Sequence, residues 1–212
     1  MIQLYNYYRS SASYRVRIAL HLKQIPFDYR AVNLRKEEQK SEAFQNINSF
    51  QAVPYLIDGN VKISQSLAIL DYLENLHPEP ALYPKDQALR AKALEIALSL
   101  TCDLHPLNNL KILIYLREHA QFDDTQIMSW MHHWFHQIFT PLEEMISKSK
   151  QTRYALTDSV SLVELCLIPQ LYNARRFDVK LDCYPILRAI ESTCLQLDAF
   201  QKALPENQPD YV

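Results

Sequence analysis

The chain has 212 residues, of which 48% are hydrophobic and 22% are charged, as in globular proteins of one large domain or two small ones. Its formal net charge of −2 excludes a strongly basic protein whose overall field would recruit nucleic acid. Gly59 is its single glycine, which excludes glycine-rich phosphate loops and dinucleotide fingerprints.

The four cysteines lie in apolar contexts and lack the spacing of metal ligands, which favours free thiols in a reducing cytoplasm and no metal site. The N-terminus lacks a basic stretch followed by an apolar core, so we expect no signal peptide. Because no apolar run is long enough to span a bilayer, we also expect no membrane partner.

The first part of the chain alternates strand and helix patterns. Apolar residues at helical spacing predict two buried helices, and Asp58-Gly59 is typical of a hairpin turn. The spacing of the first two strands and the helix between them predicts a βαβ unit with parallel strands. The expected elements are strand Ile2–Tyr7, helix Ser13–Lys23, strand Phe27–Leu34, a short exposed helix in Arg35–Asn46, strands Ala52–Ile57 and Val61–Ser64, and helix Ser66–Leu76. This βαβαββα order is the thioredoxin-like layout.

The rest of the chain is expected to be helical. The stretch HPEPALYP has three prolines in eight residues and predicts a linker. Pro106 should kink or divide the first long helix, and Ser161 with Glu164 predicts a capping box. The expected helices are Asp86–Glu118, Asp124–Ser149, Leu162–Ala174, Tyr184–Leu195 and Asp198–Leu204, followed by a loose tail, Pro205–Val212. We therefore expect an α/β domain at residues 1–77, a linker at 78–84 and an all-α domain at 85–212.

The junction between the first strand and the first helix can hold an anion. Ser10 and Ser11 stand there, and a serine hydroxyl can cap the first turn or face a ligand. The helix directs its N–H groups and positive dipole end to the same place, and Arg9, Arg15 and Arg17 add positive charge around it. Ser66 stands at a second junction of this kind, where it can cap a helix whose amides could bind a carboxylate.

Several stretches carry a family resemblance. SSASYRVRIAL (residues 10–20) closely resembles the S-S-C-x-x-R-V-R-I-A-L signature of zeta-class glutathione transferases, whose members act as maleylacetoacetate isomerases. The likeness continues in AVPYL, SQSLAILDYLE, CDLHPLNNLKIL and SLVELCLIPQLYNARRF, and it extends to bacterial maleylpyruvate isomerases. It implies the glutathione transferase fold, glutathione as cofactor, a homodimer and a place in aromatic amino acid catabolism.

The resemblance also assigns residues to glutathione. It gives the thiol contact to Ser10, with Ser11 and Arg15 beside it in the catalytic group. Other transferase classes use a tyrosine near the end of the first strand, so Tyr7 is the rival. The resemblance makes the Val53–Pro54 bond cis, although a trans bond at the start of an edge strand is commoner. The remaining glutathione contacts that it implies are Gln39, Val53, Pro54, Gln65, Ser66, His105, Asn108 and Asn109.

The substrate implied by the resemblance has two carboxylates, so its site needs positive charge. Arg176 matches the family arginine in NARRF, and an arginine fork suits a carboxylate. Arg175 reads more simply as a solvated charge at a helix end. The other implied substrate contacts are Arg9, His105 and Lys111. His105 and Asn109 are expected to lie one turn apart on a helix and so to reach the same ligand.

One position departs from the family signature. The third signature residue is often cysteine, and this chain has Ala12 there. If glutathione is the nucleophile, only an accessory group is lost; if that cysteine were the catalyst, activity would be in doubt.

The implied reaction is addition of the glutathione thiolate to a cis double bond, rotation about the resulting single bond, and elimination to the trans product. The substrate is maleylacetoacetate or, alternatively, maleylpyruvate. A broader alternative is conjugation of glutathione to halogenated acids, and a non-enzymatic one is a transferase-like interaction scaffold. His132 and His136 have the spacing of a metal pair, but a polar helix face explains them better.

Overall fold

The computed structural model describes residues 1–149 and 152–212. The chain packs as two units, Met1–Leu82 together with Leu195–Val212, and Tyr83–Cys194. The last 18 residues thus pack with the α/β unit, whereas the expected boundary assigned them to the helical one. No helix in the described part of the chain is long and apolar enough to cross a membrane.

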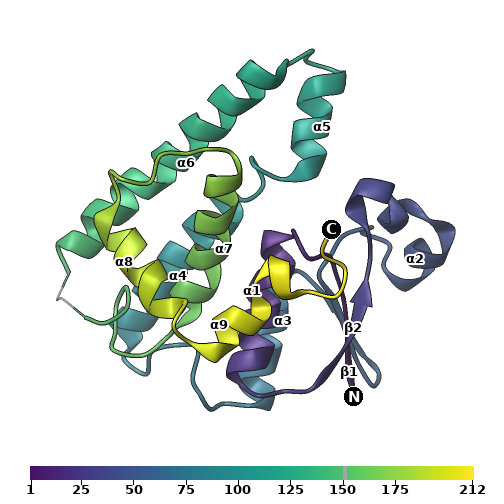
Figure 1. Cartoon of the computed structure of the whole chain (residues 1–212). Coiled ribbons are helices and arrows are strands. Elements are labelled where there is room, and N and C mark those ends of the chain that lie inside the picture. Colours follow the sequence, from purple (N-terminus) through teal and green to yellow (C-terminus); the bar gives the residue numbers. More distant parts are fainter. Residues whose placement is uncertain (150–151) are drawn as a thin grey trace. The chain divides into compact units, whose positions relative to one another are not determined.

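The first unit is built on a four-stranded mixed sheet of order β2-β1-β3-β4. β1 pairs in parallel with β2 and antiparallel with β3, and β3 forms a hairpin with β4 around Gly59, whose φ is +56°. Figure 1 shows α1 and α3 on one side of this sheet and α2 on the other. The elements are β1 (Ile2–Asn6), α1 (Ser11–Leu22), β2 (Phe27–Ala31), α2 (Glu42–Ile47), β3 (Tyr55–Asp58), β4 (Val61–Ser64) and α3 (Ser66–Leu76).

This architecture confirms the thioredoxin-like prediction, with shorter strands than expected. β3 begins at Tyr55 because Pro54 before it has no N–H to contribute to a ladder. The charged stretch between β2 and α2 forms two 3₁₀ turns, η1 (Leu34–Lys36) and η2 (Glu38–Lys40), before α2. Glu37 links these turns in the left-handed conformation at φ 58°.

The last helix, α9 (Asp198–Ala203), packs against α1 in the first unit (Figure 1). The residues after it are held in place, so the prediction of a loose tail is wrong. Gln208 is buried and its side-chain amide donates to the Lys202 and Leu204 carbonyls, at 2.8 and 2.7 Å. Asp210 accepts a hydrogen bond from the backbone N–H of Tyr8 at 3.1 Å.

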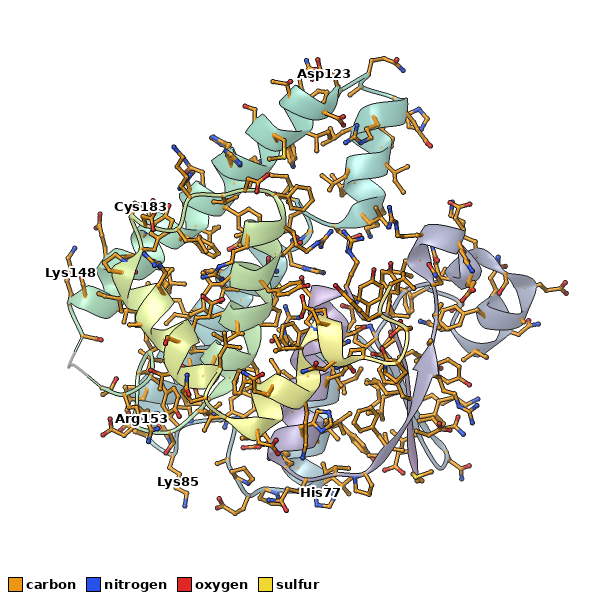
Figure 2. The ribbon with its side chains drawn as sticks, viewed as in Figure 1. His77, Lys85, Asp123, Lys148, Arg153 and Cys183 are labelled. Carbon is orange, nitrogen blue, oxygen red and sulfur yellow. The ribbon has the colours of Figure 1, made fainter. Side chains whose placement is uncertain are left out.

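The second unit is helical and packs around α7. Almost every residue of α7 is buried, and the predicted capping box of Ser161 and Glu164 opens it. The caps of α6, Asp123 and Lys148, stand at its two ends (Figure 2). The helices are α4 (Gln87–Leu98), α5 (Leu110–Glu118), α6 (Asp124–Ser147), α7 (Leu162–Arg176) and α8 (Pro185–Cys194).

The stretch predicted as one long helix is divided, as Pro106 suggested. The change begins earlier, in the π-helical turn η3 (Ser99–Leu104), and a non-helical turn joins it to α5. π-helical turns inside helices are frequent at functional sites. Residues 105–109, which carry several expected ligand contacts, therefore lie in a turn and not on a helix.

Candidate active site

The first turn of α1 presents Ser10. This residue is the N-cap, with extended backbone angles (φ −73°, ψ 115°), and its Oγ accepts a hydrogen bond from the Ser13 N–H at 3.2 Å. A serine hydroxyl has one proton to donate besides its acceptor sites, so Ser10 can cap the helix and still donate to an anion. Ser10 is partly exposed, whereas Ser11 is buried at 7% exposure.

Tyr7, the rival to Ser10, is 4% exposed at the end of β1. Burial is the main cause that raises the pKa of its hydroxyl to about 12, because an apolar surrounding disfavours the phenolate. Tyr7 therefore stays a protonated phenol near neutral pH. The structure thus favours the more exposed Ser10 as the group that meets a ligand.

A hydrogen bond joins α1 to the start of α3. Arg15 is 1% exposed, and its Nη1 donates to Ser66 Oγ at 2.5 Å. Gln65, the N-cap of α3, has φ +70° and ψ 114°, an unfavourable backbone conformation for a residue with a side chain. Such strain gathers at ligand-binding positions, where surrounding structure holds it. The structure therefore brings Arg15 and Ser66, two of the expected site residues, into direct contact.

Three further expected glutathione contacts lie before β3 in the chain. The Val53–Pro54 bond is cis, which confirms the prediction from the resemblance, and Val53 is partly exposed while Pro54 is buried. Gln39 lies in η2, and its Oε1 is buried without a hydrogen-bond partner among the described residues. A buried acceptor without a donor is costly, so this atom fits a ligand that offers an N–H.

The arginines around α1 differ in what they do. Arg9 is partly exposed, with its guanidinium 6.0 Å from the centre of the Tyr8 ring, and it is open to a ligand. Arg17 is fully buried and donates to the carbonyls of Tyr8 and Ala203, each within 3.2 Å. Arg17 therefore holds backbone segments of this unit together.

In the second unit, a buried glutamine organises two expected site residues. The Gln170 Oε1 accepts from Asn108 Nδ2 at 2.9 Å, and its Nε2 lies 3.2 Å from His105 Nδ1 and 3.5 Å from the Leu100 carbonyl. A carbonyl only accepts, so the amide nitrogen faces Leu100 and His105. His105 Nδ1 must then accept, and in the neutral ring Nε2 carries the proton.

Asn109 and Lys111 complete the turn into α5. Asn109 is the N-cap, and its Oδ1 accepts from the Lys111 N–H at 3.1 Å. Because residues 105–109 are not helical, the expected one-turn relation between His105 and Asn109 is wrong. Lys111 is exposed on α5.

The two arginines at the end of α7 have different partners. Arg176 is exposed, and its Nη1 donates to Asn173 Oδ1 at 2.9 Å. Arg175 forms a two-pronged ion pair with the buried carboxylate of Glu191 on α8. Arg175 is exposed at the end of α7, as expected, and it also neutralises a buried carboxylate, which the sequence did not predict.

The histidines of α6 have protein partners. His132 Nε2 lies 2.8 Å from the Phe177 carbonyl, and His136 Nδ1 is hydrogen-bonded to the Tyr184 hydroxyl. Among residues 1–149 and 152–212, no group of three or more histidine, cysteine or acidic side chains is arranged to hold a metal ion.

Sequence reasoning missed Gln170 and Glu191. Gln170 stands within the quoted SLVELCLIPQLYNARRF stretch, where a polar side chain in an apolar helix could have marked a buried hydrogen-bond network. Glu191 gave no comparable signal, because nothing in the sequence pairs it with Arg175 across two helices.

A thioredoxin-like unit with a cis-proline and a serine at the first helix, joined to an all-helical unit, is the architecture of a glutathione transferase. Residues 4–81 match the family described as "Glutathione S-transferase, N-terminal domain". The chain is 44% identical over 209 residues to a probable maleylacetoacetate isomerase of Vibrio cholerae, covering 98% of this chain and 97% of the relative.

Solved structures agree. A bacterial maleylpyruvate isomerase described as a zeta-class glutathione transferase superposes with a TM-score of 0.97 at 42% identity, covering 99% of this chain and all of that one. A maleylacetoacetate isomerase of Methylobacterium extorquens with bound malonate and glutathione gives 0.95 at 33% identity, with 99% of each chain covered. The chain belongs to the zeta class of the glutathione transferase family.

Proposed function

We propose that this protein catalyses the glutathione-dependent cis–trans isomerisation of maleylacetoacetate to fumarylacetoacetate. The observation that carries the proposal is the position of Ser10, which caps α1 and keeps a hydroxyl proton to donate where the positive end of the helix dipole lies. The Vibrio cholerae relative bears the name of this activity, and the Methylobacterium extorquens structure holds glutathione with a dicarboxylate.

The first unit fits glutathione, a peptide-like ligand with two carboxylates. The orphaned Gln39 Oε1 can accept an N–H, and the start of α3 at Gln65 and Ser66 can bind a carboxylate. Val53 and Pro54 lie just before β3, outside its paired residues, and an extended peptide can pair with the Val53 backbone there. In the proposal these residues hold glutathione together with Ser10, Ser11 and Arg15, and His105, Asn108 and Asn109 add contacts from the helical unit.

Bound glutathione would supply the thiolate nucleophile, which adds to the double bond and is eliminated after rotation about the resulting single bond. The Ser10 hydroxyl would donate a hydrogen bond to the sulfur, and the α1 N–H groups and dipole would favour the thiolate, which would lower the thiol pKa. Arg9, Lys111 and Arg176 hold the substrate carboxylates and stabilise developing negative charge. In the neutral ring, the Nε2–H of His105 can donate a hydrogen bond to the substrate. Ala12 takes no part, so the reaction proceeds without a protein thiol at that position.

Maleylpyruvate is the second candidate substrate, because the bacterial maleylpyruvate isomerase superposes with a TM-score of 0.97. The test is a spectrophotometric assay of both substrates side by side, with and without glutathione. Faster glutathione-dependent turnover of maleylacetoacetate supports the proposal, and a preference for maleylpyruvate transfers it to the second candidate. Failure to isomerise either substrate or to bind a glutathione-affinity column would favour the scaffold alternative.

The proposal includes a cytoplasmic homodimer. All four cysteines are free, with Cys166 and Cys194 buried, as is usual in a reducing compartment. Phe50 is 74% exposed and Leu76 is 44% exposed in the first unit, and Leu98 is 44% exposed in the second. The proposal places Phe50, the most exposed of the three, in the dimer interface.

A further inference from the structure

The C-terminal tail, defined as residues 205–212, is fastened to the loop that leads from β1 to α1. Asp210 Oδ2 accepts from the Tyr8 N–H at 3.1 Å, and its Oδ1 accepts from the Tyr29 hydroxyl. The Tyr8 hydroxyl donates to the Val212 O atom at 3.2 Å. The Tyr211 ring packs edge-on against Tyr8, with 5.5 Å between ring centres. Asp210 therefore ties this loop to β2 through a single carboxylate.

The hydrogen bonds that Asp210 accepts are of a strong type. Burial and the hydrogen bond to Asp210 raise the pKa of Tyr29 well above its usual range, so its hydroxyl stays a donor. A carboxylate that accepts from a hydroxyl and from a backbone N–H makes charge-assisted bonds, which are shorter and stronger than neutral ones.

The buried Arg17 binds the backbone carbonyls of the same loop. Its Nη2 donates to the Tyr8 carbonyl at 3.0 Å, and its Nη1 lies 3.4 Å from the Tyr7 carbonyl. The backbone of Tyr8 is thus held at its N–H by Asp210 and at its C=O by Arg17. The two side chains come from opposite ends of the sequence.

This loop sets the position of Ser10. The Ser10 N–H donates to the Tyr7 carbonyl at 3.0 Å, and only Arg9 separates Ser10 from Tyr8. A shift of Tyr8 therefore moves the serine. We infer that Asp210 is a positioning residue for Ser10, acting through Tyr8 and Tyr29. This inference rests on the proposed function, because it takes Ser10 as the group that meets the glutathione thiol.

The test uses the full chain with Asp210→Asn and, as a second variant, Tyr29→Phe. Asp58→Asn is the matched control, because Asp58 accepts from the Tyr72 hydroxyl at 2.9 Å in the same unit without touching the loop. Hydrogen exchange of residues 7–13 is measured without glutathione. The pKa of the bound glutathione thiol is measured by the ultraviolet absorbance of the thiolate, and kcat and the KM for glutathione are measured for isomerisation.

Both variants should speed exchange at residues 7–13 by about tenfold. They should raise the bound thiol pKa and lower kcat by on the order of tenfold, since small misplacements of a catalytic group are costly. The KM for glutathione should stay within about twofold, and Asp58→Asn should match the parent.

Unchanged exchange in both variants would overturn the inference. Faster exchange with an unchanged thiol pKa would also overturn it, because the contact would then be merely structural. A parent that binds glutathione but isomerises neither substrate would contradict the proposed function alone, since exchange and the thiol pKa would still decide the role of Asp210. A parent that binds no glutathione would overturn both.

Discussion

Ser10 combines two tasks at one residue, capping α1 and presenting a hydroxyl at its positive end. The two can be separated by measurement, because one affects folding and the other affects turnover. Tyr7 lies three residues earlier but is buried, so its hydroxyl is less accessible to a ligand than the hydroxyl of Ser10.

Ser10→Ala should lower glutathione-dependent turnover on the order of a hundredfold, because it removes a donor to developing charge. Tyr7→Phe should change turnover by less than about twofold. Steady-state kinetics measures both. A larger loss in Tyr7→Phe would contradict the assignment of Ser10.

The matched control for Ser10→Ala is Ser41→Ala, since Ser41 caps α2 by accepting from the Phe44 N–H at 3.3 Å. Each substitution should lower the free energy of unfolding by about 1 kcal/mol. Only Ser10→Ala should also lower turnover.

Arg175 and Arg176 are neighbours with different partners. Their alanine variants should therefore affect different properties, stability for Arg175 and activity for Arg176. Arg176→Ala should lower kcat/KM by about ten- to a hundredfold with folding nearly intact, because a charge-assisted bond to a substrate carboxylate is worth about 1.5–3 kcal/mol. Arg175→Ala should instead lower the free energy of unfolding by about 1–3 kcal/mol, since it leaves the Glu191 carboxylate buried without its partner.

Chemical denaturation and steady-state kinetics on both variants make this comparison. Arg176→Lys should recover only part of the activity, because an ammonium cannot offer a two-pronged contact. A kinetic defect confined to Arg175→Ala would transfer the substrate role to Arg175, and two mild kinetic defects would transfer it to Arg9 and Lys111.

At the scale of elements, the carboxylate that completes the capping box of α7 belongs to Glu164 and is buried in the core. Glu164 is fully buried and accepts from the Ala155 N–H and the Ser161 N–H, at 2.9 and 2.7 Å. Burial outweighs these donors and raises its pKa above the ordinary value of 4.5.

The raised pKa gives a signed prediction for stability against pH. As pH rises above the unfolded-state pKa, the unfolded carboxyl loses its proton while the folded one keeps it, so folding becomes less favourable until the folded pKa is passed. Glu164→Gln should therefore flatten the decline in stability above about pH 4.5. Denaturation midpoints at a series of pH values measure this, and parallel curves for parent and variant would contradict it.

At the scale of the whole molecule, the exposed Phe50 gives the proposed homodimer its sharpest test. Burying a phenylalanine is worth about 1.5–3 kcal/mol, and a homodimer carries two copies of Phe50, so Phe50→Ser should weaken dimerisation by on the order of a hundred- to ten-thousandfold. Light scattering over a concentration series measures the change. Val61→Ser is the control, since Val61 is a 39%-exposed apolar residue on strand β4. A parent that is monomeric at every concentration would contradict the homodimer itself.

Local chemistry made much of this protein predictable from its sequence. Residues with strong local preferences, such as the helix-capping Ser161 and Glu164, the hairpin-forming Gly59 and the helix-dividing Pro106, act on the backbone next to them. The thioredoxin-like order and the serine at the start of α1 follow from such patterns. The cis bond at Pro54 could be predicted only from the family resemblance.

Only the tertiary structure decided which distant groups meet. Arg175 pairs with Glu191, Gln170 orients His105 and Asn108, and Asp210 returns to Tyr8 at the other end of the chain. No period, cap or spacing encodes such pairs, because they form when whole elements pack and buried polar groups must find partners. The sequence by itself therefore determined the elements and the family, whereas long-range packing decided which distant polar groups pair within each unit.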